Sequence, residues 1–166
     1  MRKKWYLIIG LAVLALTAGC QGTQSSREVS DPLKEVEGKE EFEKVGAYIE
    51  VPAGAENTKY YIIDDEIAEI RFDFNGASYI YRSSNQTEDV ADLGVKFDKE
   101  QSRTVEAGKN GTAAEVRVDE NGGQLAQWQY GENYYGLYTD GQAEDTVFDS
   151  LCRELLEDSA DDAQAS

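Results

Sequence analysis

The feature that most constrains the fold is an Asn-Gly pair at positions 75 and 76, which lies between two runs of alternating apolar and polar residues. Asn-Gly is the preferred pair in two-residue hairpin turns, because both turn residues take a positive φ. Such a turn pairs Ile70 with Tyr81 on one face. On the other face it pairs Glu69 with Arg82, and opposite charges at such positions stabilise a hairpin. This stretch therefore predicts two antiparallel strands with a defined register.

A second hairpin is predicted further along the chain. Residues 113–119 alternate between apolar and charged side chains, which is typical of a strand with one buried face. We expect a three-residue loop at residues 121–123, which pairs Val116 with Trp128. A two-residue loop would instead set Val116 against the polar Gln127.

The next turn is expected at residues 131–133, before the last strand. It would place Trp128 opposite Gly136, whose missing side chain leaves room for the indole. Tyr138 then shares the face of Trp128, and Tyr135 lies on the opposite face because side chains alternate along a strand.

Helical patterns flank these strands. Phe42 and Val45 are three residues apart and precede Gly46, which predicts a short N-terminal helix. Five residues near the C-terminus follow the spacing of one buried helix stripe: Val147, Phe148, Leu151, Cys152 and Leu155. With shorter strands at residues 48–51 and 59–63, we expect an α+β fold. It consists of an antiparallel sheet of about six strands with the two helices packed on one face.

The N-terminal residues have the layout of an export signal. Residues 1–19 carry three basic residues directly after Met1, continue with an apolar run and end in small side chains. The apolar run is shorter than the roughly 20 residues that a membrane-spanning helix needs. Residues 16–20, Leu-Thr-Ala-Gly-Cys, resemble the lipobox of bacterial lipoproteins, in which the cysteine receives a diacylglyceryl group and the chain is cut just before it. The alternative is an ordinary secretory signal with an incidental cysteine.

These observations predict how the chain is divided. Residues 1–19 are expected to be a lipoprotein signal peptide, and residues 20–38 a polar, flexible spacer that begins at the lipidated Cys20. A single domain follows at residues 39–158, and residues 159–166 form a disordered acidic tail. The lipid on Cys20 would hold the domain at the outer leaflet of the cell membrane, in an extracytoplasmic location.

Composition narrows the classes of function. The net charge is −17, and removal of residues 1–19 takes away three positive charges and leaves −20. Because nucleic-acid-binding proteins neutralise phosphates with Lys and Arg, we expect no nucleic-acid partner. The acidity keeps an extracellular domain soluble or, alternatively, attracts cations or a basic partner. The chain has no histidine, so Ser-His-Asp and Cys-His catalysis and histidine metal sites are excluded.

Few side chains suggest a site, and we expect no catalytic residue, no metal ligand and no cofactor. Cys152 lies on the apolar helix stripe and is expected to be a buried, inert thiol. The acidic turns at residues 64–66 and 119–121 could bind a cation, but they are more typical of solvated turns. Tyr61 and Tyr135 fall on the faces opposite their apolar neighbours, so they are the candidates for partner binding, by stacking on a sugar ring or peptide.

The order of these parts resembles a known family. The lipobox, the polar spacer, a strand ending in "YIYRSS" and the stretch "LAQWQYGENYYGLY" are followed by a final helix. This order resembles small uncharacterised lipoproteins of Firmicutes. It is also similar to a domain of unknown function found on anti-sigma-factor-like membrane proteins. The resemblance covers about residues 31–157. It implies an extracytoplasmic α+β domain at a Gram-positive surface and implies no catalytic chemistry.

Three functions follow as hypotheses. The first is a non-enzymatic lipoprotein that binds or senses an envelope protein or glycan. The second is a carrier or chaperone for an apolar ligand or lipoprotein, which requires a cavity between sheet and helices. The third is a cell-wall hydrolase with two carboxylates about 5–10 Å apart in one cleft, one of them with a raised pKa.

Overall fold

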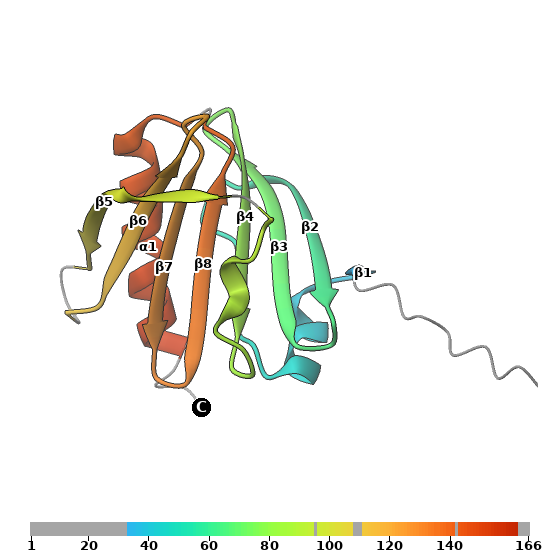
Figure 1. Cartoon of the computed structure of the whole chain (residues 1–166). Coiled ribbons are helices and arrows are strands. Elements are labelled where there is room, and N and C mark those ends of the chain that lie inside the picture. Colours follow the sequence, from blue (N-terminus) through green and yellow to red (C-terminus); the bar gives the residue numbers. More distant parts are fainter. Residues whose placement is uncertain (1–32, 95, 108–110, 142, 163–166) are drawn as a thin grey trace, which may run out of the picture.

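The backbone forms eight strands, two 3-10 segments and one α-helix in the computed structural model, which describes residues 33–162 except 95, 108–110 and 142 (Figure 1). In chain order these are β1 (Leu33–Val36), η1 (Lys39–Val45), β2 (Glu56–Ile63), β3 (Ile67–Phe74), β4 (Ala77–Ser84), η2 (Asp89–Ala91), β5 (Phe97–Glu106), β6 (Ala113–Asp119), β7 (Gln124–Tyr130), β8 (Asn133–Thr139) and α1 (Asp145–Asp162). The strands make one sheet in the order β1-β2-β3-β4-β8-β7-β6-β5. Two meanders of four strands therefore meet where β4 pairs with β8.

The β3–β4 hairpin confirms the predicted register. Asn75 and Gly76 have φ values of 49° and 82°, as a two-residue turn of this kind requires. Ile70 lies opposite Tyr81, and in the same register Glu69 lies opposite Arg82 on the other face of the sheet.

The β6–β7 loop has the predicted length but begins one residue earlier. The loop comprises residues 120–122, so Val116 pairs with Ala126 rather than with Trp128. The carboxylate of Asp119 accepts backbone N–H groups from Asn121 at 2.7 Å and Gly123 at 2.8 Å. These hydrogen bonds close the loop directly after Asp119. The partner of Val116 differs from the predicted one by two residues. Because side chains alternate, each side chain keeps its predicted face.

The predicted β7–β8 register is wrong by one residue. The turn has two residues, Gly131 and Glu132, and Trp128 pairs with Tyr135 rather than with Gly136. Gly131 takes a φ of 60°, which a glycine adopts without steric cost. Because side chains alternate, the one-residue difference moves Tyr135 to the core face and Tyr138 to the opposite face.

Helix α1 covers one face of the sheet and lies behind it in Figure 1. Its buried stripe contains Phe148, Leu151, Cys152 and Leu155, as predicted. The helix continues to Asp162, beyond the predicted domain end at residue 158. Residues 159–162 are therefore helix rather than disordered tail. Ser159 and Ala160 are buried, and the indole N–H of Trp128 donates to Ser159 Oγ at 3.2 Å.

The N-terminal part differs from the prediction in three respects. The predicted helix is a 3-10 segment, η1, although Phe42 and Val45 are buried as expected. Residues 48–51 are irregular rather than a strand. Residues 33–36, predicted to belong to the flexible spacer, form the edge strand β1. The sheet also gains β5, a mostly polar edge strand whose sequence carries little alternation.

Several predictions lie outside the described residues. They concern the signal peptide at residues 1–19, Cys20 with the spacer up to residue 32, and residues 163–166. Among the residues that are described, no helix is long and apolar enough to cross a membrane.

The β7–β8 register can be tested with two tyrosines. Tyr135 is buried on the core face, whereas Tyr134 is half-buried on the other face. We expect Tyr135→Ala to lower the free energy of unfolding by about 3–5 kcal/mol. Tyr134→Ala should lower it by about 1 kcal/mol or less. Urea denaturation measures both values, and a larger loss for Tyr134→Ala would support the three-residue turn instead.

Candidate functional site

Neither candidate tyrosine presents its ring at the surface. Tyr135 is 2% exposed and stacks on Trp128 with ring centroids 5.3 Å apart, because the β7–β8 register turns it into the core. Tyr61 lies on the predicted face, opposite Glu69. It is nevertheless only 8% exposed, because the guanidinium of Arg71 lies 4.6 Å from the centre of its ring. The sequence pattern predicted the correct face for Tyr61 but did not indicate that Arg71 covers its ring.

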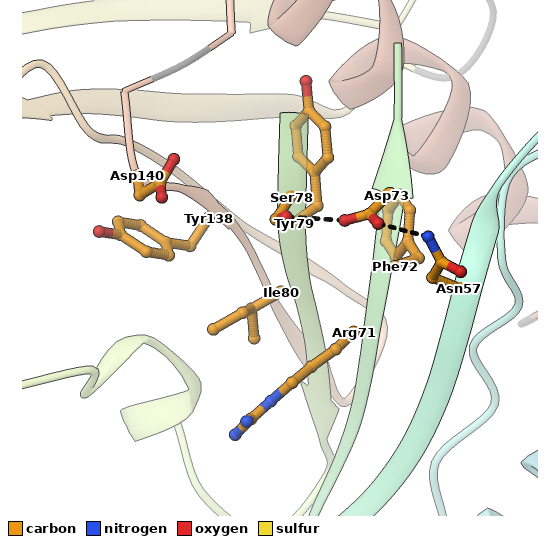
Figure 2. A pocket seen from close by; sticks show the side chains of 9 residues that line it. All are labelled: Asn57, Arg71, Phe72, Asp73, Ser78, Tyr79, Ile80, Tyr138 and Asp140. Atoms are coloured by element: carbon orange, nitrogen blue, oxygen red, sulfur yellow. Dashed lines mark hydrogen bonds between the residues drawn. The ribbon is translucent and has the colours of Figure 1, made fainter. Parts of the chain in front are cut away.

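The face of the sheet opposite α1 carries a hollow of about 350 Å³ over β3, β4 and β8 (Figure 2). This volume is within the range of about 300–1,000 Å³ that is typical of ligand sites. Six outward-facing side chains supply its chemistry: Arg71, Asp73, Ser78, Ile80, Tyr138 and Asp140. We call this feature the β3–β4–β8 hollow.

The strand registers explain why these side chains meet. Arg71, Ile80 and Tyr138 are cross-strand neighbours in one row across β3, β4 and β8. Asp73 and Ser78 pair in the next outward-facing row. In Figure 2 Tyr138 lies with Asp140 on one side of the hollow and Asp73 on the other, with Ile80 between them.

Asp73 is held by two neutral donors. Ser78 Oγ donates to Asp73 Oδ1 at 2.7 Å, and Asn57 Nδ2 donates to Asp73 Oδ2 at 2.7 Å, as Figure 2 shows. These hydrogen bonds, that from Ser78 first, lower the pKa of Asp73 from its usual value. The side chain is therefore a carboxylate at neutral pH, and its donors leave its negative charge uncompensated.

Arg71 belongs to a charge cluster on the same face. Its Nε donates to Glu69 Oε1 at 2.5 Å, and Arg82 Nε donates to Glu69 Oε2 at 2.6 Å. Glu69 is completely buried, so two guanidinium groups replace the water that its carboxylate loses. The ion pair and the Tyr61 ring together fix the direction of Arg71. The predicted Glu69–Arg82 pair is confirmed, and Arg71 is an addition to it.

The connection between β4 and β5 covers part of this face, and η2 lies in front of the sheet in Figure 1. Val90 of η2 packs over Gly136, where an added Cβ would lie 3.7 Å from Val90 Cγ2. Gly136 therefore faces Val90 rather than Trp128. Arg82 Nη1 donates to the carbonyl of Asp92 at 3.0 Å, which ties the connection to the charge cluster.

Beside the hollow, Phe97 contacts Tyr138 edge-on, with ring centroids 6.0 Å apart. Burial raises the pKa of the Tyr138 phenol, and the negative charges of Asp119 and Asp140 raise it further. Tyr138 is therefore a neutral, half-buried ring in a negative electrostatic environment. The hollow thus places the carboxylate of Asp140 near the aromatic ring of Tyr138.

The remaining candidates offer less chemistry. Burial raises the pKa of the Cys152 thiol to about 12, which is consistent with the predicted inert cysteine. The Asp119 carboxylate is engaged by its own loop. In the described part of the chain, no group of three or more acidic, cysteine or histidine side chains could hold a metal ion. A more open hollow of about 590 Å³ near β1 has charged walls of both signs, including Lys34, Glu35 and Lys59.

One residue of the β3–β4–β8 hollow, Tyr138, could have been predicted from the sequence with a different β7–β8 register. Had the turn been assigned to Gly131 and Glu132 alone, Trp128 would have paired with Tyr135 and Tyr138 would have faced outward. The partner strand was not predictable in the same way. Ile80 and Tyr138 become neighbours only because β4 pairs with β8.

Comparison with known proteins identifies no relative. The chain matches no protein-family model, no curated protein and no solved structure. The resemblance to small lipoproteins of Firmicutes therefore stays a prediction, and the residues of the hollow are the basis for a functional proposal.

The charge cluster makes a stability prediction. We expect Glu69→Gln to lower the free energy of unfolding by about 3 kcal/mol, because the largely buried guanidinium of Arg82 loses its ionic partner. Glu115→Gln is the control, since Glu115 pairs with Arg117 at the surface and its loss should cost about 1 kcal/mol or less. Urea denaturation gives both values. Equal losses would show that Arg82 does not depend on the buried carboxylate.

Proposed function

We propose that this protein is a membrane-anchored extracytoplasmic lipoprotein whose domain is a non-enzymatic binding or sensing module of the cell envelope. The observation that carries the binding role is the β3–β4–β8 hollow. It combines an apolar floor at Ile80 and Tyr138 with charged groups held in place by neighbours. Such a mixture of apolar surface and a few oriented polar groups is typical of recognition sites.

The anchor follows from the sequence around Cys20. A diacylglyceryl group supplies two acyl chains, which suffice for stable attachment where one does not. From Cys20 to the first residue of β1, Leu33, a fully extended chain reaches at most roughly 45 Å. The domain would therefore work close to the outer leaflet, where its partners are envelope proteins or glycans.

The chemistry of the hollow favours binding over hydrolysis. A carboxylate-dependent hydrolase needs one acid whose pKa is raised, so that it is protonated at the start of the reaction. In the hollow, the pKa of Asp73 is lowered by its hydrogen bonds to Ser78 and Asn57. Asp73 is thus suited to hold a positive charge rather than to donate a proton.

The carrier alternative requires a space for an apolar ligand between the sheet and α1. That region is filled by side chains that are at most 1% exposed: Phe148, Leu151, Leu155 and Leu156. Opening it would expose this packed core, at a cost of several kcal/mol. The carrier is therefore the second candidate, and the outward face remains the better-supported binding surface.

The anchor has a direct test with a matched control. In the source bacterium, Cys20→Ser should abolish labelling by a radioactive fatty acid and release the protein from the membrane fraction. Cys152→Ser should change neither result, because Cys152 is buried in the domain. A Cys20→Ser protein that stays in the membrane after an alkaline wash would contradict the lipid anchor.

The binding face can be tested by photo-crosslinking in intact cells. We expect p-benzoylphenylalanine in place of Tyr138, at the hollow, to give a discrete crosslinked product. The same photoprobe in place of Tyr48, which is 50% exposed and lies outside the hollow, is the control. A product from position 48 but not from position 138 would move the binding surface away from this face.

A further inference from the structure

We infer that the β3–β4–β8 hollow binds a basic side chain, lysine or arginine, presented by a segment of a partner protein. This inference rests on the proposed binding function and specifies the chemistry of its partner. It is based on the charges of the hollow, on its apolar floor and on the charge of the whole chain.

The first observation concerns which charges in the hollow are compensated. Arg71 is paired with the buried Glu69. Asp73 receives hydrogen bonds from the neutral side chains of Asn57 and Ser78, and Asp140 is exposed. Within the described part of the chain, neither Asp73 nor Asp140 forms an ion pair. The hollow therefore presents two carboxylates to which a cation can bind.

The second observation is the surface between these carboxylates. Ile80 and Tyr138 form a half-buried floor, which suits the methylene stem of a lysine or arginine side chain. The Tyr138 ring can also attract a cation through its π face. A simple metal ion would use the carboxylates but would gain nothing from the apolar floor.

The third observation disfavours an anionic ligand. Arg71 could offer its remaining guanidinium N–H groups to a carboxylate or phosphate. Such a ligand would lie close to Asp73 and Asp140, and it would approach a chain of net charge −17. Long-range repulsion slows the association of like-charged molecules, whereas a basic segment is attracted. Arg71 is better suited to donate to backbone carbonyls of the same basic segment.

The test uses residues 20–166 with Cys20→Ser, since every core residue whose burial the structure describes lies between positions 42 and 160. The probes are three capped peptides: acetyl-Gly-Leu-Lys-Leu-Lys-Gly-amide and its counterparts with Gln or Glu in place of Lys. Titrations are followed by amide chemical shifts in NMR spectra. We expect the Lys peptide to shift Ser78, Ile80 and Tyr138 and to bind more tightly than the Gln and Glu peptides.

Two double variants separate the hollow from general acidity. Asp73→Asn with Asp140→Asn should raise the Kd of the Lys peptide about tenfold. Glu43→Gln with Glu154→Gln removes the same charge from exposed positions outside the hollow and should change the Kd by about twofold or less. The NMR spectrum of each variant shows whether it is folded.

Three results would overturn the inference. Equal losses of affinity in the two double variants would show binding to net charge alone. Tighter binding of the Glu or Gln peptide at the same amides would show that the ligand class is wrong, while the binding face would remain. If no peptide shifts these amides, the basic-segment inference fails, and crosslinking at position 138 then decides separately whether the proposed binding face holds.

Discussion

The pairing of β4 with β8 is the constraint on which the rest of the structure depends. Six consecutive pairs, from Tyr79 opposite Thr139 to Ser84 opposite Tyr134, join the two meanders into one sheet. On one face this pairing makes the core continuous, so that α1 and η1 contribute to the same apolar cluster. On the other face it places Ile80 beside Tyr138. Without these pairs neither the shared core nor the β3–β4–β8 hollow would exist.

The two faces of the sheet are built on different physical principles. The face under α1 is filled by apolar and aromatic side chains, and burial of their surface stabilises the fold. The other face is organised by Glu69, whose buried carboxylate is tolerable only because Arg71 and Arg82 both donate to it. That arrangement orients Arg71 and covers Tyr61. It also leaves Asp73 without a cationic partner among the described residues, and this imbalance is the basis of the proposed basic ligand.

The elements that the sequence predicted well carried an unambiguous local signal. Asn-Gly at positions 75 and 76 permits one tight turn, and the charge pair of Glu69 with Arg82 supports the same register. The apolar stripe of α1 likewise identified its buried face. The β7–β8 turn was ambiguous, because the residues around Gly131 are compatible with a loop of either two or three residues. The two loops differ by one residue in register. The edge strands β1 and β5 were missed because an edge strand needs little apolar alternation.

The sequence by itself determined an antiparallel sheet with a C-terminal helix against one face, one hairpin register, an acidic chain and a buried Cys152. Those properties depend on neighbouring residues, on periodicity or on composition, all of which are local or additive. The tertiary structure alone decided that Tyr61 is covered, that Gly136 faces Val90 and that the six polar and apolar groups of the hollow meet. Each of these depends on contacts between strands and connections distant in the chain, and a linear pattern does not specify which strands become neighbours.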